Sequence, residues 1–393
     1  MLKAVNRIVN KLKTVISHSK KPLISFVIYK FALLLPKQKT VFYSSYRGIG
    51  RDPAIEYLAN LHQYTFPNHR RILDQPEWLK YFPALIERIY VNCRYHFQLA
   101  SSEVLIMNMH APRYFRKRNK QVYIQTWHGI PIKRLGRDRL GFLYSRKYAE
   151  DMAREVASWD LLISSGHFES LCLQSAFGRP KELLELGPLR HAQFEISRKN
   201  IEQGLSRFSL KKSILFAPTW REGSEAKFEN YDPLVTAIQI AEAFSDHLVF
   251  FKFHHKFTPR IYQAIPSNLN LIKANADLSV LYQEIDLLIT DYSSIAFDFA
   301  YFKKPILFFV PDMAEYRVSP GIYFEIDRIF YSMIATEFHV LCSKIYAVLN
   351  QGQSFDTPTK AFSTFYGLMS ESNIRLEIIS RFSEFREFIH VSH

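Results

Sequence analysis

After residue 36 the chain alternates short apolar runs with longer stretches of helical periodicity, such as Pro53–His62 and Arg146–Ala157. Short apolar runs indicate strands buried on both faces of a parallel sheet, and the helical stretches between them complete βαβ units. The predicted strands form two series. The first series is Thr40–Tyr43, Arg88–Val91, Val104–Met107, Val122–Gln125 and Leu161–Ser164, and the second is Ser213–Ala217, Leu248–Phe253, Leu271–Lys273, Leu287–Thr290 and Ile306–Phe309.

Two series of strands predict two domains in an α/β protein, and 393 residues are enough for two hydrophobic cores. The polar stretch Glu195–Lys212 predicts the boundary between them. We therefore expect two Rossmann-like domains facing each other across a cleft, at 37–200 and at 206–393, with the C-terminal helices in the second. Ligands of open parallel sheets bind beyond the carboxyl ends of the strands, so the loops after the apolar runs should carry the chemistry.

The first 36 residues have a different pattern, that of a basic amphipathic helix, which suits the surface of an anionic membrane. The apolar run Leu23–Leu35 is shorter than the roughly 20 residues that cross a bilayer, and it lacks the cleavage site of a signal peptide. Residues 1–36 are therefore predicted to attach the protein peripherally to the cytoplasmic face of the cell membrane; the alternative is a helix packed on its own domain. On a helical wheel, one side of this segment is apolar and contains Leu2, Val5, Ile8, Val9, Leu12, Val15 and Ile16. The opposite side is basic and contains Lys3, Arg7 and Lys11.

Charge and motifs remove several classes of function. The formal net charge is +14, but residues 1–51 carry eleven Lys and Arg and no acidic residue, so a broad basic surface for nucleic acid is not expected. Cys93, Cys172 and Cys342 are far apart and form no CxxC pair, which indicates reduced thiols and no structural zinc. The chain has no GxGxxG, no P-loop and no acidic pair placed to hold Mg²⁺. We expect a transferase that needs neither metal nor cofactor.

Two loops of the first domain carry candidate chemistry. Trp127-His128-Gly129 follows the strand at 122–125, and His128 is a candidate general base beside a glycine that lets the backbone approach a substrate. A hydrogen-bonded structural histidine is the alternative. Ser165-Gly166 follows the next strand and opens a helix, where free N–H groups could bind an acceptor or phosphate, or simply form an ordinary N-cap.

Three loops of the second domain carry the candidate donor site. Arg221 could neutralise phosphate, or pair with Glu222 at the surface. His254 and His255 point to opposite faces if extended and would not chelate one metal ion; one of them could contact phosphate or donate a proton. Asp291-Tyr292-Ser293-Ser294 precede a helix at 295–302, whose N-terminus could bind a diphosphate or merely be capped by serine. The predicted donor-binding residues are Thr219, Trp220, Arg221, Lys252, Asp291, Tyr292, Ser293 and Ser294.

Taken in order along residues 40–330, these motifs resemble the CDP-glycerol glycerophosphotransferase family of teichoic acid and capsule synthesis. The matching segments are VFYSSYRGIGRDPAIEYL, QTWHGIPIKRLG, ISSGHFES, LFAPTWRE, DLLITDYSSIAFDFAYFKKPILFFVPD and GIYFEID. The resemblance implies a GT-B fold, a peripheral membrane enzyme and a CDP-activated polyol phosphate donor. It implies catalytic roles for His128 and His254 and a donor-phosphate site at Asp291–Ser294. His255 stands where the family usually has proline, and Gly187–Ala192 lacks the usual acidic residue.

The reaction that the resemblance implies moves glycerol phosphate from CDP-glycerol to a hydroxyl of a lipid-linked or polymeric acceptor, with His128 as the base. The predicted acceptor side contains Trp127, Gly129, Ser165 and Gly166. CDP-ribitol is the alternative donor. A nucleotide-sugar glycosyltransferase of the same fold is a second hypothesis, because one fold hosts many chemistries. A membrane-surface scaffold or an RNA-binding protein is a third, and the position of the aromatics in apolar runs does not favour RNA binding.

Overall fold

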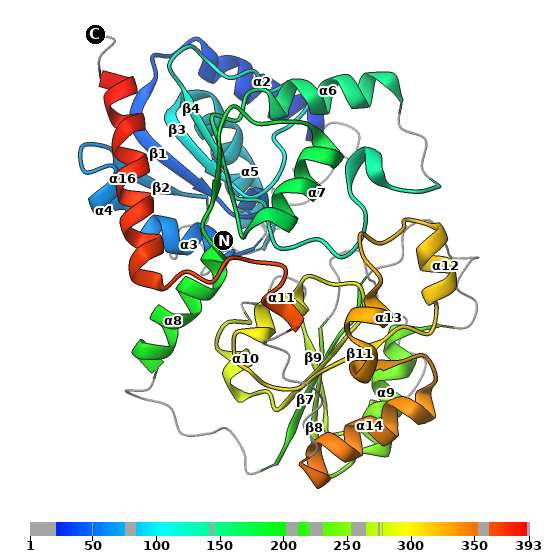
Figure 1. Ribbon diagram of the computed structural model, residues 1–393. Helices are drawn as coiled ribbons and strands as arrows, with labels where there is room; N and C mark the ends of the chain where they lie inside the picture. The colour runs from blue at the N-terminus through cyan, green and yellow to red at the C-terminus, as the bar shows by residue number, and fades with distance from the viewer. Residues whose placement is uncertain are drawn as a thin grey trace, which may run out of the picture.

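The computed structural model describes residues 21–48, 50–74, 84–141, 145–201, 211–219, 231–252, 265–273, 276, 278–352 and 361–390. These residues form two domains, each built on a six-stranded sheet whose neighbouring strands all run parallel. Figure 1 shows the first sheet in the upper half of the molecule and the second in the lower half.

The sheet of the first domain has the strand order β2-β1-β3-β4-β5-β6. Alternate residues of β1 point to opposite faces: Val41 and Tyr43 belong to one buried cluster and Phe42 to another. Both faces are covered by helices, which is why these strands read as continuous apolar runs. The elements are α2 (Lys21–Leu33), β1 (Gln38–Ser44), α3 (Pro53–Asn60), α4 (His62–Thr65), β2 (Arg70–Leu73), α5 (Ala84–Ser101), β3 (Ser102–Met107), β4 (Val122–Gln125), α6 (Arg146–Val156), β5 (Leu161–Ser164), α7 (His167–Phe177), β6 (Leu183–Glu185) and α8 (Leu189–Ile201).

The second sheet has the order β12-β11-β10-β7-β8-β9. Its two faces again have separate cores, since Leu288 belongs to one cluster and Leu287 and Ile289 to the other. The elements are β7 (Ser213–Ala217), α9 (Pro233–Ala243), β8 (Leu248–Lys252), β9 (Leu269–Ile272), α10 (Leu281–Glu284), β10 (Leu287–Thr290), α11 (Ile295–Ala300), β11 (Ile306–Phe309), α12 (Met313–Val318), α13 (Ile326–Ile329), β12 (Ile334–Ala335), α14 (Phe338–Gln351) and α16 (Glu371–His390).

The last helix, α16, crosses back to the first domain, where Figure 1 shows it in red beside α3 and α4. Its buried residues Ile374, Ile378 and Phe382 pack in the same cluster as the apolar residues of β1 and α3. The C-terminal helices were predicted within the second domain, and α16 differs from that expectation. The two domains are therefore linked by two crossings of the chain, one after α8 and one before α16.

Other predictions of elements differ from the structure in instructive ways. Arg88–Val91, predicted as a strand, lies inside the 18-residue helix α5, so that prediction is wrong. The local β-branched and aromatic residues were overridden by the helix around them. Strand β2 was missed because it is an edge strand with two exposed arginines, Arg70 and Arg71, and only one buried residue, Ile72. The predicted boundary at Glu195–Lys212 begins within α8, which continues to Ile201.

Candidate active site

The carboxyl edges of the two sheets meet at Gly129 and Ser294. Gly129 lies in the loop after β4, and Ser294 lies in the loop after β10. Gly129 has a φ of +125°, and a Cβ atom at this position would lie 2.9 Å from Ser294 Oγ and 3.0 Å from Ser294 Cβ. Only glycine allows the two loops to approach this closely without strain. The loop that carries His128 is therefore in direct contact with the loop that carries the predicted donor-binding serines.

His128 is held in the tautomer of a proton acceptor. Its Nδ1 lies 2.8 Å from the carbonyl oxygen of Asn108, which follows β3. A carbonyl only accepts hydrogen bonds, so Nδ1 carries the proton and Nε2 keeps its lone pair. Burial lowers the pKa of His128 to about 4, although the hydrogen bond to Asn108 acts in the opposite direction. The imidazole is consequently neutral at physiological pH, as a general base must be.

Trp127, two residues after the end of β4, packs against His128. Its backbone has a φ of +53°, and its ring, 5% exposed, stacks 4.4 Å from the ring of His128. The backbone N–H of Trp127 donates to Gln125 Oε1 at 3.0 Å. Non-glycine residues persist in the left-handed region where their surroundings impose it, often at functional sites. Trp127, predicted on the acceptor side, forms the buried platform that orients His128.

Asp291 and Tyr292 hold the donor loop in place. The Asp291 carboxylate accepts hydrogen bonds from Thr219 N at 2.8 Å and Thr219 Oγ1 at 2.6 Å, which fastens the loop after β7 to the loop after β10. Tyr292 is 1% exposed and stacks on Tyr316 with ring centroids 3.7 Å apart. Both were predicted to bind the donor, but in this structure they are buried within the loop scaffold.

The two serines of the same loop are half-buried at the start of α11. Ser293 Oγ accepts from Ile295 N at 3.4 Å, and the Ser294 side chain makes no capping hydrogen bond. Their hydroxyls, with Ser294 against Gly129, are the polar groups of this loop placed to meet a ligand between the domains. Within the Asp291–Ser294 motif, the prediction of donor binding therefore rests on these two serines.

The remaining predicted donor residues are divided between described and undescribed segments. Lys252 ends β8 at the carboxyl edge of the second sheet, where burial, and to a lesser extent the charge of Arg190, lowers the pKa of its ammonium group. Trp220, Arg221 and His254 lie outside the described residues, and their assignments stay predictions.

A narrow hollow between the loops collects three of the four predicted acceptor-side residues: Trp127, Gly129 and Ser165 line it together with Glu169 and Arg190. Glu169 belongs to α7, and burial raises the pKa of its carboxyl to about 7. Ser165 does not offer a free N–H group, because that group donates to Glu169 Oε2 at 2.7 Å.

The neighbouring Gly166 packs closely against the chain segment that contains Gly367. A Cβ atom on Gly166 would lie 2.9 Å from the backbone nitrogen of Gly367. Gly367 N in turn donates to the Ser165 carbonyl at 2.8 Å. This loop therefore packs on the segment that returns the chain to α16, and the structure gives Gly166 a role in that packing.

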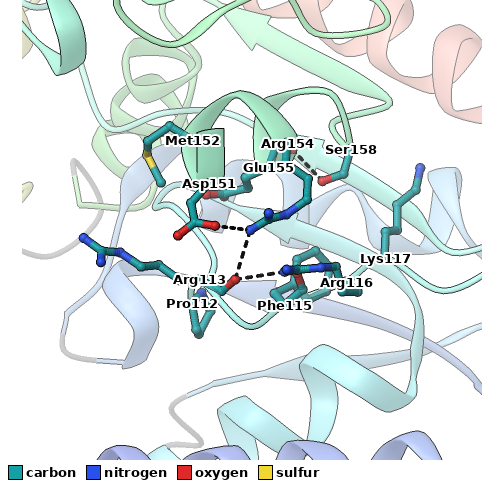
Figure 2. Close-up of a pocket in the computed structure, with 10 residues that line it drawn as sticks. All are labelled: Pro112, Arg113, Phe115, Arg116, Lys117, Asp151, Met152, Arg154, Glu155 and Ser158. Carbon is teal, nitrogen blue, oxygen red and sulfur yellow. Dashed lines mark hydrogen bonds and ion pairs between the residues drawn. The ribbon is translucent and has the colours of Figure 1, made fainter. Parts of the chain in front are cut away.

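A second cavity, of about 180 Å³, lies elsewhere in the first domain (Figure 2). It is formed by residues 112–117 and α6 and shares no lining residue with the hollow. Two of its three arginines are bonded within its own wall: Arg154 pairs with Asp151, and Arg116 donates to the Arg113 carbonyl at 2.9 Å, as Figure 2 shows. These bonds hold the guanidinium groups of Arg154 and Arg116 at the wall of the cavity.

Sequence reasoning missed Asn108 and Tyr46, which both shape the surroundings of His128. Asn108 acts through its backbone carbonyl, so its side chain gave no signal. Tyr46, in the loop after β1, places its ring 6.1 Å from the ring of His128. Its position just beyond a strand's carboxyl end is the signal that could have found it.

Two parallel sheets with their carboxyl-edge loops in contact, and a neutral histidine at that junction, define a two-domain protein of GT-B architecture. The family described as CDP-Glycerol:Poly(glycerophosphate) glycerophosphotransferase matches residues 27–375, and the chain belongs to this family. The family resemblance seen in the sequence is thereby confirmed.

Individual relatives agree with that assignment. The chain is 30% identical over 299 residues to a teichoic acid poly(glycerol phosphate) polymerase of Staphylococcus epidermidis, covering 71% of this chain and 41% of that one. It is 29% identical over 334 residues to the protein of the same name from Bacillus subtilis, covering 77% and 43%. The chain thus spans less than half the length of these two relatives.

The solved structures it resembles include a variant of the wall teichoic acid polymerase TagF with CDPG. That structure has a TM-score of 0.71 and 24% identity, and the match covers 98% of this chain and 99% of that one. The likeness confirms the predicted fold class.

Proposed function

We propose that the protein transfers glycerol phosphate from CDP-glycerol to a hydroxyl of a lipid-linked or polymeric acceptor in teichoic acid or capsule synthesis. The observation that supports the proposal is the contact between Gly129 and Ser294, which joins the loop of a neutral His128 to the donor loop. Membership of the family supports the donor class.

The arrangement accounts for a complete transfer step. Nε2 of His128 takes the proton of the acceptor hydroxyl as its oxygen attacks the phosphorus that bears glycerol. The bond from that phosphorus to the bridging oxygen breaks, and CMP leaves with the electron pair. Phosphoryl transfer of this kind depends mainly on alignment and on neutralising charge. Ser293, Ser294 and Lys252 are the described residues placed to hold the donor phosphates.

Titration calorimetry tests the donor. We expect CDP-glycerol to bind the wild type more tightly than CMP or UDP-glucose, equally with Mg²⁺ and with EDTA. Ser294→Ala should weaken binding about tenfold or more, because a hydrogen bond to a charged group contributes about 1.5–3 kcal/mol. Ser343→Ala is the matched control, since its hydroxyl bonds to the His339 carbonyl within α14. Tighter binding of CDP-ribitol would show that CDP-ribitol is the donor instead. Binding of UDP-glucose alone would favour a glycosyltransferase.

We also propose peripheral attachment to the cytoplasmic face of the cell membrane through residues 1–36. Helix α2 buries Tyr29 and Ala32 against the first domain. None of the described helices is both long and apolar enough to cross a bilayer. The opposite face of α2 exposes Ile24, Val27 and Phe31 at 36%, 56% and 60%, and Leu34, just after the helix, continues this apolar stripe at 83%. Such a stripe beside a basic segment suits a membrane interface.

Sedimentation with phosphatidylglycerol and phosphatidylcholine vesicles tests this attachment. The double variant Val27→Glu/Phe31→Glu should bind phosphatidylglycerol vesicles at least tenfold more weakly, because apolar area can no longer be buried in the interface. The control Leu376→Glu changes a side chain that is 66% exposed on α16. Equal loss in both variants, or none in either, would contradict a role for α2.

A further inference from the structure

Arg190, at the start of α8, joins the two domains through two carboxylates. Its Nε and Nη2 donate to Asp298 Oδ1 and Oδ2, both at 2.7 Å, and its Nη1 donates to Asp52 Oδ2 at 2.5 Å. Asp298 belongs to α11 in the second domain, and Asp52 is the N-cap of α3 in the first. The side chains are 16%, 9% and 0% exposed for Arg190, Asp298 and Asp52. The bidentate pair is the geometry that fixes orientation as well as distance.

Each aspartate is connected to one half of the candidate active site. Asp298 lies on the short helix that begins directly after Ser294, so holding Asp298 holds the donor loop. Asp52 lies next to Tyr46, where its charge, after burial, contributes to raising the pKa of the phenol. The ring of Tyr46 in turn faces the ring of His128. Besides the direct contact at Gly129, a second path from Ser294 to His128 therefore runs through Arg190.

The residue after Arg190 grips the same helix. His191 Nε2 lies 2.8 Å from the carbonyl oxygen of Phe297, and burial lowers the pKa of His191 to about 4, so this ring is neutral and donates. Two consecutive residues of α8 thus bind α11: Arg190 binds the side chain of Asp298, and His191 binds the backbone carbonyl of Phe297. This pair occupies the Gly187–Ala192 segment, which lacks the family's usual acidic residue.

Asp52 and Asp298 can lie near each other only because the positive charge of Arg190 lies between their carboxylates. One guanidinium lies between two carboxylates that belong to different domains. Removing the guanidinium would leave two buried negative charges facing each other, and such charges repel strongly where water is excluded. Removing Asp298 instead would leave Arg190 paired within the first domain.

We propose that Arg190 is a positioning residue that locks α11 against the first domain, so that His128 and the donor-loop serines face each other only while both aspartates are bridged. The proposal rests on the proposed transfer for its kinetic consequence, but its structural consequence can be measured independently. In this proposal Arg190 acts through the position of Ser294 and not on the reacting atoms.

The distance between the domains is the first readout. Nitroxide labels at Glu150→Cys on α6 and Tyr346→Cys on α14, both exposed, report it by double electron–electron resonance in a background with the native cysteines replaced by serine. We expect a narrow distribution in the wild type and a broader one shifted to a different distance in Arg190→Gln. Adding Asp298→Asn should remove the shift that repulsion causes but leave the distribution broad, because nothing then bridges the domains at this point.

The kinetic readout is a split between kcat and KM. Arg190→Gln should lower kcat with CDP-glycerol by on the order of 10²-fold, the cost of a small misplacement of reacting groups, while KM changes less than threefold. Arg190→Gln/Asp298→Asn should keep kcat well below that of the wild type, because the bridge between the domains is still missing. Arg317→Gln is the matched control, because Arg317 also bridges two carboxylates, Glu325 and Asp327, but within the second domain.

Three outcomes separate the possibilities. An unchanged distance distribution in Arg190→Gln overturns the proposal, whatever the activity. A changed distribution in a protein whose wild type transfers nothing supports the clamp and refutes the proposed function. If Arg190→Gln does not fold, Asp298→Asn alone decides, since it weakens only the bond of Arg190 to the second domain and keeps its pair with Asp52. This variant should broaden the distribution, and an unchanged distribution would refute the clamp.

Discussion

We expect His128→Ala to lower kcat by about 10²–10⁴-fold, the usual contribution of a positioned general base. Nε2 of His128 is the proposed proton acceptor, on the loop that contacts the donor loop through Gly129, and alanine leaves no group to take the acceptor's proton. Binding of CDP-glycerol should change little, because the proposed phosphate-binding residues belong to the second domain. Steady-state kinetics and calorimetry on the same preparations measure the two effects.

The control for this prediction is a second buried, neutral histidine. His96 is held by the Tyr114 hydroxyl at 2.7 Å, and burial lowers its pKa to about 4 as well. His96→Gln should retain most of the turnover per folded molecule, although its stability falls. If His128→Ala kept more than a tenth of the wild-type turnover, the base would have to be another group.

The same geometry predicts the pH profile. A general base works in its neutral form, so activity is lost as the pH falls through the pKa of His128. With that pKa lowered to about 4, the acid limb of kcat/KM should lie near pH 4 and not near the ordinary value of about 6.5. Half-loss of kcat/KM close to pH 6.5 in the folded protein would contradict a buried neutral His128.

We expect Gly129→Ala to reduce kcat/KM by on the order of 10²-fold, because a displacement of about 1 Å between reacting groups has consequences of that size. The added Cβ atom would meet Ser294 Oγ at 2.9 Å and Ser294 Cβ at 3.0 Å. The loops of the two domains would have to separate, which moves His128 away from the donor serines. The φ of +125° adds backbone strain of its own.

Gly352→Ala isolates that strain from the clash. Gly352 also has a positive φ, +65°, but nothing lies within 4 Å of its Cβ position. Both variants should lose some thermal stability, since left-handed backbone costs alanine about 1–2 kcal/mol, while only Gly129→Ala should lose activity. Comparable turnover in the two variants would show that the contact with Ser294 is not needed for transfer.

The interior strands show how far local pattern predicts a fold. Strands β4, β5, β7, β10 and β11 coincide with the predicted runs at both ends. A strand covered by helices on both faces needs apolar residues at every position, and this requirement is visible in the sequence. An edge strand such as β2 needs few, and the apolar segment Arg88–Val91 could be a strand or part of a helix until its neighbours were known.

The loops of the site were found by the same logic, because the carboxyl edges of parallel sheets collect ligands. The roles of the individual residues within each loop were not found in this way. Asp291 and Ser294 are neighbours in one motif, yet Asp291 faces Thr219 within the domain while Ser294 faces Gly129 across the junction. Which side chain turns inward depends on partners that are distant in sequence.

The sequence alone therefore determined the two α/β domains, the strands of their interiors and the loops that face the junction, because these depend on burial patterns carried by consecutive residues. The tertiary structure decided which nitrogen of His128 holds the proton, through the Asn108 carbonyl, and which two carboxylates Arg190 bridges. It also decided that α16 completes the first core. Each of these depends on a contact between segments far apart in the chain, and such contacts exist only once both sheets have formed.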